Sequence, residues 1–167
     1  MGYEEHKHTV IKHVTCAVIT TSDSRTEAED ESGKLIKQRL TDAGHKIAHY
    51  TILRNDADII RQQIKGLLMH LDVQVIITSG GTGLSHRDVT VDVITPLLEK
   101  KLDGFGELFR QLTYEEIGTG SILSRAVAGV ASGKIIICLP GSLGAAQLAM
   151  DKIIIPEIGH MVREASR

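Results

Sequence analysis

The sequence contains no tryptophan, only two cysteines and only 3% aromatic residues. A core with so few large rings must be built mainly from Ile, Leu, Val and Ala, in keeping with a hydrophobic content of 42%. Cys16 and Cys138 each lie within an apolar run and have no Cys-x-x-Cys partner. We therefore expect both to be buried small side chains in a reducing compartment, with neither a disulfide nor a zinc site.

Long apolar runs and runs of basic residues are also missing. The formal net charge is −2 and there is no basic run, which argues against nucleic-acid binding. No apolar run approaches the roughly 20 residues of a membrane span, and the N-terminus has no hydrophobic signal segment. We therefore expect a cytoplasmic protein that binds neither nucleic acid nor membrane.

The 167 residues suffice for one domain, preceded by a short polar segment. Metal binding by His6, His8 and His13 is one interpretation of this segment. A solvated arm or a contact between subunits is favoured, because no cysteine or paired carboxylates accompany these histidines. We predict a flexible arm at residues 1–12 and a folded domain at residues 13–167.

The most informative stretch follows an apolar, β-branched run at residues 73–77, which predicts a strand buried on both faces of a parallel sheet. The run leads directly into Thr78, Ser79, Gly80, Gly81, Thr82 and Gly83. Three glycines let backbone N–H groups approach a ligand closely, and three hydroxyls add donors. These residues predict a phosphate-binding loop. A tight turn between strand and helix is the alternative, because a glycine-rich turn alone is a weak motif.

Arg87 and Asp88 follow shortly after the glycines. Arg87 is suited to bind a phosphate oxygen directly. Asp88 would repel phosphate unless a cation lay between them, so the combination favours a magnesium-bridged di- or triphosphate with Asp88 as the metal ligand. A helix-capping Asp and a solvated Arg are the alternative.

Other candidate residues also follow predicted strands, at the edge where open α/β sheets place ligands. Ser22 and Asp23 come after the strand expected at residues 14–20. Asp56 comes after the strand expected at residues 45–53, where it or Asn55 would cap the next helix.

Pro140, Gly141 and Ser142 end the last predicted strand and begin a helix with Ser142 as its N-cap. A glycine turn at a helix N-terminus has the geometry of an anion site. A capped helix without a ligand is the alternative.

The alternation of strands and helices predicts a three-layer α/β domain with a mainly parallel sheet and a β-hairpin made by residues 124–130 and 134–139. Phe105 and Phe109 are expected in the core, with a subunit interface as the competing use. Ser32 is expected to cap the first helix, and Pro156 to interrupt a surface helix at residues 153–162.

These segments together resemble the MoaB/MogA family of molybdenum cofactor biosynthesis proteins. The resemblance covers residues 14–161 and is closer to the MoaB branch because of the segment at residues 102–130. It rests on TSGGTGLSHRDVT at residues 78–90, SDSR at 22–25, DESG at 30–33, GFGELFR at 104–110, EEIGTGSILSRAVAGV at 115–130 and LPGS at 139–142.

The resemblance implies that molybdopterin and ATP are the substrates and Mg²⁺ the cofactor of an adenylyl transfer that releases pyrophosphate. Asp88 would hold the magnesium, helped by Asp56, and residues 78–83 with Arg87 would bind the nucleotide. Molybdopterin would contact Ser22, Asp23, Pro140, Gly141 and Ser142. The resemblance also implies a homo-oligomer, either trimer or hexamer, and contacts with other molybdenum cofactor biosynthesis proteins.

Three alternatives stay open at this point. They are a non-catalytic molybdopterin carrier, a CinA-like pyrophosphatase, and an interaction module like the related domain of gephyrin. The presence of Arg87 and Asp88 favours catalysis, and Thr82 beside a lone Asp88 disagrees with the CinA pattern. Leu143 and Gly144 stand where family members often have Pro and Lys, and loss of that Lys would weaken charge contacts to an anionic substrate.

Overall fold

A six-stranded sheet forms the centre of the structure, a computed structural model that describes residues 10–167. Four neighbouring strands are parallel, in the order β2 (Lys46–Leu53), β1 (Thr15–Thr21), β3 (Val75–Ser79) and β6 (Lys134–Leu139). The antiparallel strands β5 (Val127–Ala131) and β4 (Lys100–Lys101) complete the sheet beside β6. The mainly parallel sheet and the β5–β6 hairpin are confirmed, whereas the two-residue strand β4 was not anticipated.

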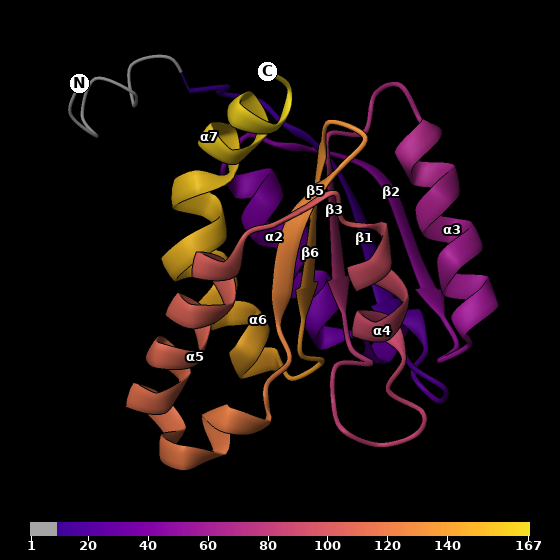
Figure 1. Cartoon of the computed structure of the whole chain (residues 1–167), viewed down its shortest axis with the longest axis vertical. Helices are drawn as coiled ribbons and strands as arrows, with labels where there is room; N and C mark the ends of the chain where they lie inside the picture. The colour runs from indigo at the N-terminus through magenta and orange to yellow at the C-terminus, as the bar shows by residue number, and fades with distance from the viewer. Residues whose placement is uncertain (1–9) are drawn as a thin grey trace.

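Helices cover both faces of this sheet and make the three layers visible in Figure 1. One face carries α2 (Glu31–Asp42), α5 (Asp103–Ile117), α6 (Leu143–Ala149) and α7 (Ile155–Ala165). The other carries α3 (Ala57–Met69) and α4 (Thr90–Ile94). The short helical turns η1 (Glu27–Glu29), η2 (Thr95–Leu97) and η3 (Gly118–Leu123) lie in the connections, and η4 (Met150–Ile154) joins α6 to α7.

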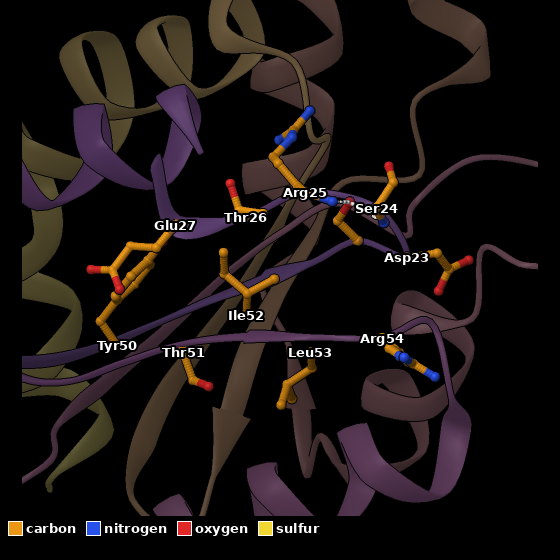
Figure 2. Close-up of a pocket in the computed structure, with 11 residues that line it drawn as sticks. Asp23, Ser24, Arg25, Thr26, Glu27, Tyr50, Thr51, Ile52, Leu53 and Arg54 are labelled. Atoms are coloured by element: carbon orange, nitrogen blue, oxygen red, sulfur yellow. Dashed lines mark hydrogen bonds between the residues drawn. The ribbon is translucent and has the colours of Figure 1, made fainter. Parts of the chain in front are cut away.

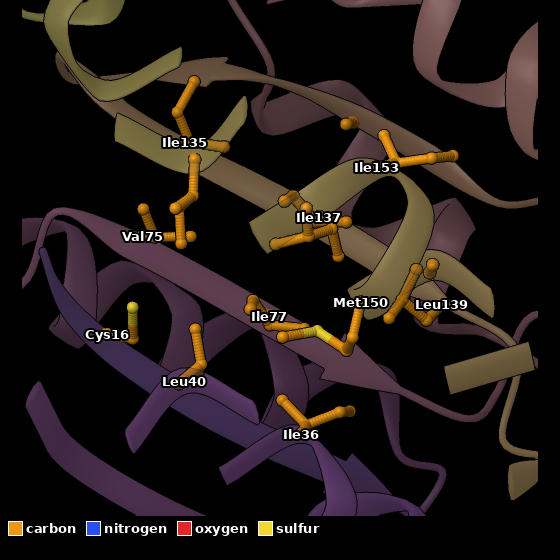
Figure 3. Packing of buried hydrophobic residues seen from close by; sticks show 14 of the residues in the cluster. Cys16, Ile36, Leu40, Val75, Ile77, Ile135, Ile137, Leu139, Met150 and Ile153 are labelled. Carbon is orange, nitrogen blue, oxygen red and sulfur yellow. The ribbon is translucent and has the colours of Figure 1, made fainter. Parts of the chain in front are cut away.

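Strand β3 is buried on both faces, as its apolar run predicts. Val75 and Ile77 enter the larger core beneath α2, α6 and η4, where Figure 3 shows them with Met150, while Ile76 enters the opposite core. Alternate side chains of a strand point to opposite faces, so one short strand contributes to two cores.

The few aromatic and sulfur side chains lie where the sequence predicts. Phe105 and Phe109 of α5 are both buried, and their ring centroids are 6.2 Å apart, which confirms the core interpretation. Cys16 and Cys138 are free and fully buried, and burial raises the pKa of each thiol to about 12. Neither thiol is positioned for redox chemistry.

Two local predictions were wrong. The N-cap of α2 is Asp30 and not Ser32, because the Asp30 carboxylate accepts a hydrogen bond from the Gly33 N–H. Pro156 does not end the helical run; it stands in the first turn of α7, directly after the π-helical turn η4. The π-helical turn η4 carries the chain from α6 into α7 without a break, and α7 buries Ile158 and Val162.

Most of the predicted N-terminal arm, including His6 and His8, lies outside the described residues. Ile11 packs against the larger core, and its carbonyl oxygen lies so close to Gly159 of α7 that any side chain there would collide with it. No helix within residues 10–167 is both long and apolar enough to cross a membrane.

Candidate functional site

The sheet register brings three strand ends together. Thr20 of β1 lies opposite Ser79 of β3, and Ser79 lies opposite Leu139 of β6. The loops that follow these strands therefore begin side by side at one edge of the sheet, as expected for a ligand site in an open α/β fold.

The loop after β3 depends on glycine at two consecutive positions. Gly80 and Gly81 have φ angles of +102° and +65°, a region that favours glycine. A side chain at Gly80 would collide with the Thr21 carbonyl oxygen, and one at Gly81 would collide with the Thr90 hydroxyl. The loop is also tied at its base, because the Gly80 N–H donates to the Leu139 carbonyl at 2.9 Å.

Asp88 folds back toward the glycines. Its Oδ2 accepts hydrogen bonds from the Ser85 hydroxyl at 2.7 Å and from the Ser85 N–H at 3.2 Å. A Cβ at Gly83 would lie 2.6 Å from this oxygen, so only glycine leaves room for the carboxylate here. The turn from Ser85 to Asp88 thus holds one acid beside bare backbone.

A cavity of about 510 Å³ opens at this point. The glycine loop and Asp88 form one wall, and the turn after β6 forms another. The remaining lining comes from α5, from η3 with the residue that follows it, and from α6, namely Phe109, Thr113, Glu116, Ile117, Gly120, Leu123, Ser124, Gly144, Ala145 and Leu148. The cavity therefore joins a polar loop suited to phosphate with an apolar wall suited to a flat organic group.

A second groove, of about 500 Å³, runs between the loop after β1 and the edge strand β2 (Figure 2). Ser22 and Asp23 line this groove, whereas Pro140, Gly141 and Ser142 line the first cavity. The structure thus distributes the five predicted molybdopterin residues over two neighbouring hollows.

Arg25 connects these two hollows. It lines the second groove, and its Nη1 donates to the Gly141 carbonyl at 3.3 Å and to the Ser32 hydroxyl at 3.1 Å. Ser32 also donates to the Gly141 carbonyl, at 3.1 Å. The turn after β6 is therefore held from the β1 side of the sheet.

Only some of the residues predicted to bind the nucleotide line the first cavity. Gly80, Gly81, Thr82 and Gly83 all line the first cavity. Thr78 and Ser79 are fully buried within β3 and line neither hollow, so direct contact of their hydroxyls with phosphate stays a prediction.

Arg87 also lines neither hollow. Its side chain is 79% exposed and pairs with Asp23 at 3.1 Å.

Asp56 is the N-cap of α3. Its Oδ1 accepts hydrogen bonds from the Asp58 N–H at 2.9 Å and the Ile59 N–H at 3.0 Å, which confirms the capping interpretation. Asp56 lines neither hollow, but its neighbour Asn55 reaches the glycine loop, where Asn55 Oδ1 would lie 2.9 Å from a Cβ at Gly81. A metal-binding role for Asp56 stays a prediction.

The surroundings of Asp88 fit a magnesium ion whose other ligands come from phosphate and water. No group of three or more His, Cys, Asp or Glu side chains within residues 10–167 could hold a metal without a ligand's help. Magnesium at phosphate sites needs only one or two carboxylates, because phosphate oxygens and water complete the shell. Asp88, beside bare backbone and lining the cavity, meets that requirement.

Some site residues were missed from the sequence. The apolar wall includes Phe109 and Leu123, and the periodicity of α5 indicates burial without indicating a cavity. Arg125 lies behind the glycine loop and bonds to its backbone, and no local signal in the sequence indicates that contact.

One known protein family matches almost the whole chain. The family model for a probable molybdopterin binding domain matches residues 17–160. The chain belongs to the MoaB/MogA family. The match spans nearly all of the described chain, including both hollows and the glycine loop.

Relatives along the whole length carry MoaB names. Molybdenum cofactor biosynthesis protein B of Bacillus subtilis is 47% identical over 165 residues, covering 98% of this chain and 97% of that protein. The protein of the same name from Bacillus cereus is 45% identical over 168 residues, covering 100% and 99%.

Solved structures agree. A crystal structure of molybdenum cofactor biosynthesis protein B aligns with a TM-score of 0.89 at 45% identity, covering 92% of this chain and 96% of that one. The tungsten cofactor synthesizing protein MoaB from Pyrococcus furiosus aligns with a TM-score of 0.83 at 33% identity, covering 94% and 99%. CinA from Thermoplasma acidophilum, with a TM-score of 0.59 at 16% identity, shares the fold alone.

Proposed function

We propose that this protein acts in molybdenum cofactor biosynthesis by transferring AMP from ATP to the terminal phosphate of molybdopterin. One observation carries the proposal: Asp88 is held against the glycine loop in the wall of a cavity whose other side is apolar. This arrangement suits a nucleotide phosphate chain at the loop and a ring system opposite it.

The transfer joins two anions. An oxygen of the molybdopterin phosphate attacks the α-phosphorus of ATP, a new P–O bond forms, and the bond to the bridging oxygen breaks as pyrophosphate leaves. Catalysis of such a step depends mainly on holding the reactants in line and neutralising charge. The backbone amides of residues 80–83 would bind phosphate oxygens, and Arg87 would add a positive charge at the mouth of the loop.

Magnesium would be held by Asp88, with Asp56 as the predicted helper, and would supply charge neutralisation on the phosphate chain. Ser85 orients Asp88 for this role through its N–H and hydroxyl. Pro140, Gly141 and Ser142 would contact molybdopterin together with the apolar wall. The protein is also proposed to form a homo-oligomer, either a trimer or a hexamer. Light scattering in solution tests this.

The decisive experiment incubates the purified protein with ATP, Mg²⁺ and molybdopterin and follows both adenylylated product and pyrophosphate. Wild-type protein is expected to form both in equal amounts, and Asp88→Asn is expected to form neither while keeping its melting temperature. Binding of molybdopterin without any product would replace the proposal with a carrier function, and pyrophosphate without an adenylylated product would indicate a pyrophosphatase.

A matched control separates the loss of one carboxylate from a general change in charge. Asp58→Asn removes a carboxylate from a side chain that is 93% exposed and pairs only at the surface with Arg61. Its turnover should equal that of the wild type. Unchanged turnover in Asp88→Asn would reject the assignment of Asp88.

A further inference from the structure

Arg125 lies between η3 and β5, far along the chain from the glycine loop, yet its guanidinium closes the base of that loop. Nε donates to the Thr82 carbonyl oxygen at 3.2 Å, and Nη2 donates to the Asp88 carbonyl oxygen at 3.1 Å. Thr82 and Asp88 are the first and last residues of the segment 82–88, which ends in the candidate metal ligand, Asp88. One planar group therefore spans both of its ends.

The same guanidinium is itself held in place. Nη1 and Nη2 donate to the two carboxylate oxygens of Asp92 in the first turn of α4, at 2.9 and 3.0 Å. A bidentate pair of this kind fixes the plane of the Arg125 side chain. The orientation of α4 is thereby transmitted to the loop that precedes it.

Arg125 acts on the site from behind. It is absent from the residues that line the cavity, whereas Thr82, Gly83 and Asp88 line it. In a trans peptide the C=O and the next N–H point in opposite directions. Holding the Thr82 carbonyl toward Arg125 therefore turns the Gly83 N–H to the opposite side of the loop.

We propose that Arg125 is a positioning residue, which sets the direction of the Gly83 amide and the place of Asp88 by binding the carbonyl groups of Thr82 and Asp88. This inference rests on the proposed function for its effect on turnover, but its effect on the loop does not depend on it. Arg125 touches no reacting atom, so its substitution changes geometry and leaves the chemical groups in place.

The test compares Arg125→Lys with Asp92→Asn. Lysine keeps the charge, but a single nitrogen cannot reproduce the planar fork that reaches both carbonyl oxygens. Asp92→Asn removes the same ion pair and leaves both bonds to the loop. If the loop is positioned by Arg125, Arg125→Lys lowers kcat/KM by about 10- to 100-fold, the scale of a misplacement near 1 Å. Asp92→Asn loses far less.

Two readouts separate positioning from mere stability. Hydrogen exchange measured over peptides that cover residues 80–90 should be faster in Arg125→Lys than in Asp92→Asn at equal melting temperature. Guanidinium ion at a low, non-denaturing concentration should restore part of the turnover of Arg125→Ala, because it can occupy the emptied site.

The outcomes are distinct. Equal hydrogen exchange and equal turnover in Arg125→Lys and Asp92→Asn would overturn the inference. Inactivity of the wild type would reject the proposed function alone, since hydrogen exchange of the loop still tests the role of Arg125.

Discussion

The guanidinium of Arg87 donates a hydrogen bond of 3.1 Å to the carboxylate of Asp23, which joins two loops that are 64 residues apart in the chain. The other oxygen of Asp23 accepts from the Asn55 N–H at 2.9 Å. That bond and the charge of Arg87 lower the pKa of Asp23, although partial desolvation opposes them. Asp23 therefore stays ionised at neutral pH. It forms an ion pair with Arg87, the cation that is proposed to bind the nucleotide.

Replacing Asp23 should release Arg87. In Asp23→Asn the amide oxygen can still accept from Asn55, but Arg87 loses its counterion and becomes available to a phosphate. An exposed ion pair is weak, so the affinity for Mg–ATP should rise by only a small factor. Titration calorimetry measures this, with Arg87→Gln expected to bind more weakly. Weaker binding by Asp23→Asn would mean that Asp23 does not restrain Arg87.

The two proposed roles of Asp56 can be separated by one substitution. Serine is a good N-cap but has no carboxylate, so Asp56→Ser should retain the stability of α3. Asp56→Ala, which lacks a cap, should lose about 1 kcal/mol in urea denaturation. If Asp56 helps to hold magnesium, both variants lose turnover and require more Mg²⁺. Normal turnover in Asp56→Ser would assign Asp56 to capping alone.

The glycine loop should tolerate no side chain at Gly81. Gly81→Ala forces a positive φ on alanine and a collision with the Thr90 hydroxyl, and strain of this kind costs on the order of 1–3 kcal/mol. Gly66→Ala is the matched control, because Gly66 lies in α3 with open space around it and alanine should stabilise the helix by about 0.5–1 kcal/mol. Thermal unfolding of both variants should therefore shift in opposite directions.

Asp30 predicts a dependence of stability on pH. This carboxylate is fully buried and accepts from the Thr20 hydroxyl at 2.6 Å, the Tyr50 hydroxyl at 2.7 Å and the Gly33 N–H at 3.0 Å. Burial opposes ionisation, but these hydrogen bonds and the charge of Arg25 together hold the pKa of Asp30 below its ordinary value of 3.8.

A lowered pKa in the folded state means that Asp30 contributes stability above its ordinary pKa and loses that contribution as the pH falls through the folded value. Asp30→Asn should cost roughly 1.5–3 kcal/mol at neutral pH, the scale of hydrogen bonds to a charged group. The variant should also lose less stability than the wild type as the pH falls below the ordinary pKa of an aspartate. Urea denaturation across this range tests the difference, and parallel pH profiles would contradict the role given to Asp30.

Several features were predictable because they depend on neighbours in the chain. The run that becomes β3 is apolar and β-branched, and the turn after it needs φ angles that favour glycine. Ser142 and Asp56 cap helices through bonds to residues two or three positions ahead. The family resemblance, carried by the same segments, is confirmed by a match over residues 17–160.

The N-cap of α2 shows where local reasoning fails. Ser32 and Asp30 are both good capping residues, and the choice between them depends on partners elsewhere. Thr20 of β1 and Tyr50 of β2 donate to Asp30, whereas Ser32 and Arg25 bond to Gly141 beyond β6. Only the arrangement of the sheet places those partners.

By itself, the sequence determined the glycine loop, its acid and the strand that leads to it, because backbone freedom and hydrophobic pattern act over a few residues. The tertiary structure alone decided three contacts. Arg125 donates hydrogen bonds to the backbone of this loop, Asp23 pairs with Arg87, and α5 and η3 supply the apolar wall of the cavity. Such contacts join segments tens of residues apart, and they exist only after the strands have paired in one register and placed their ends at one edge of the sheet.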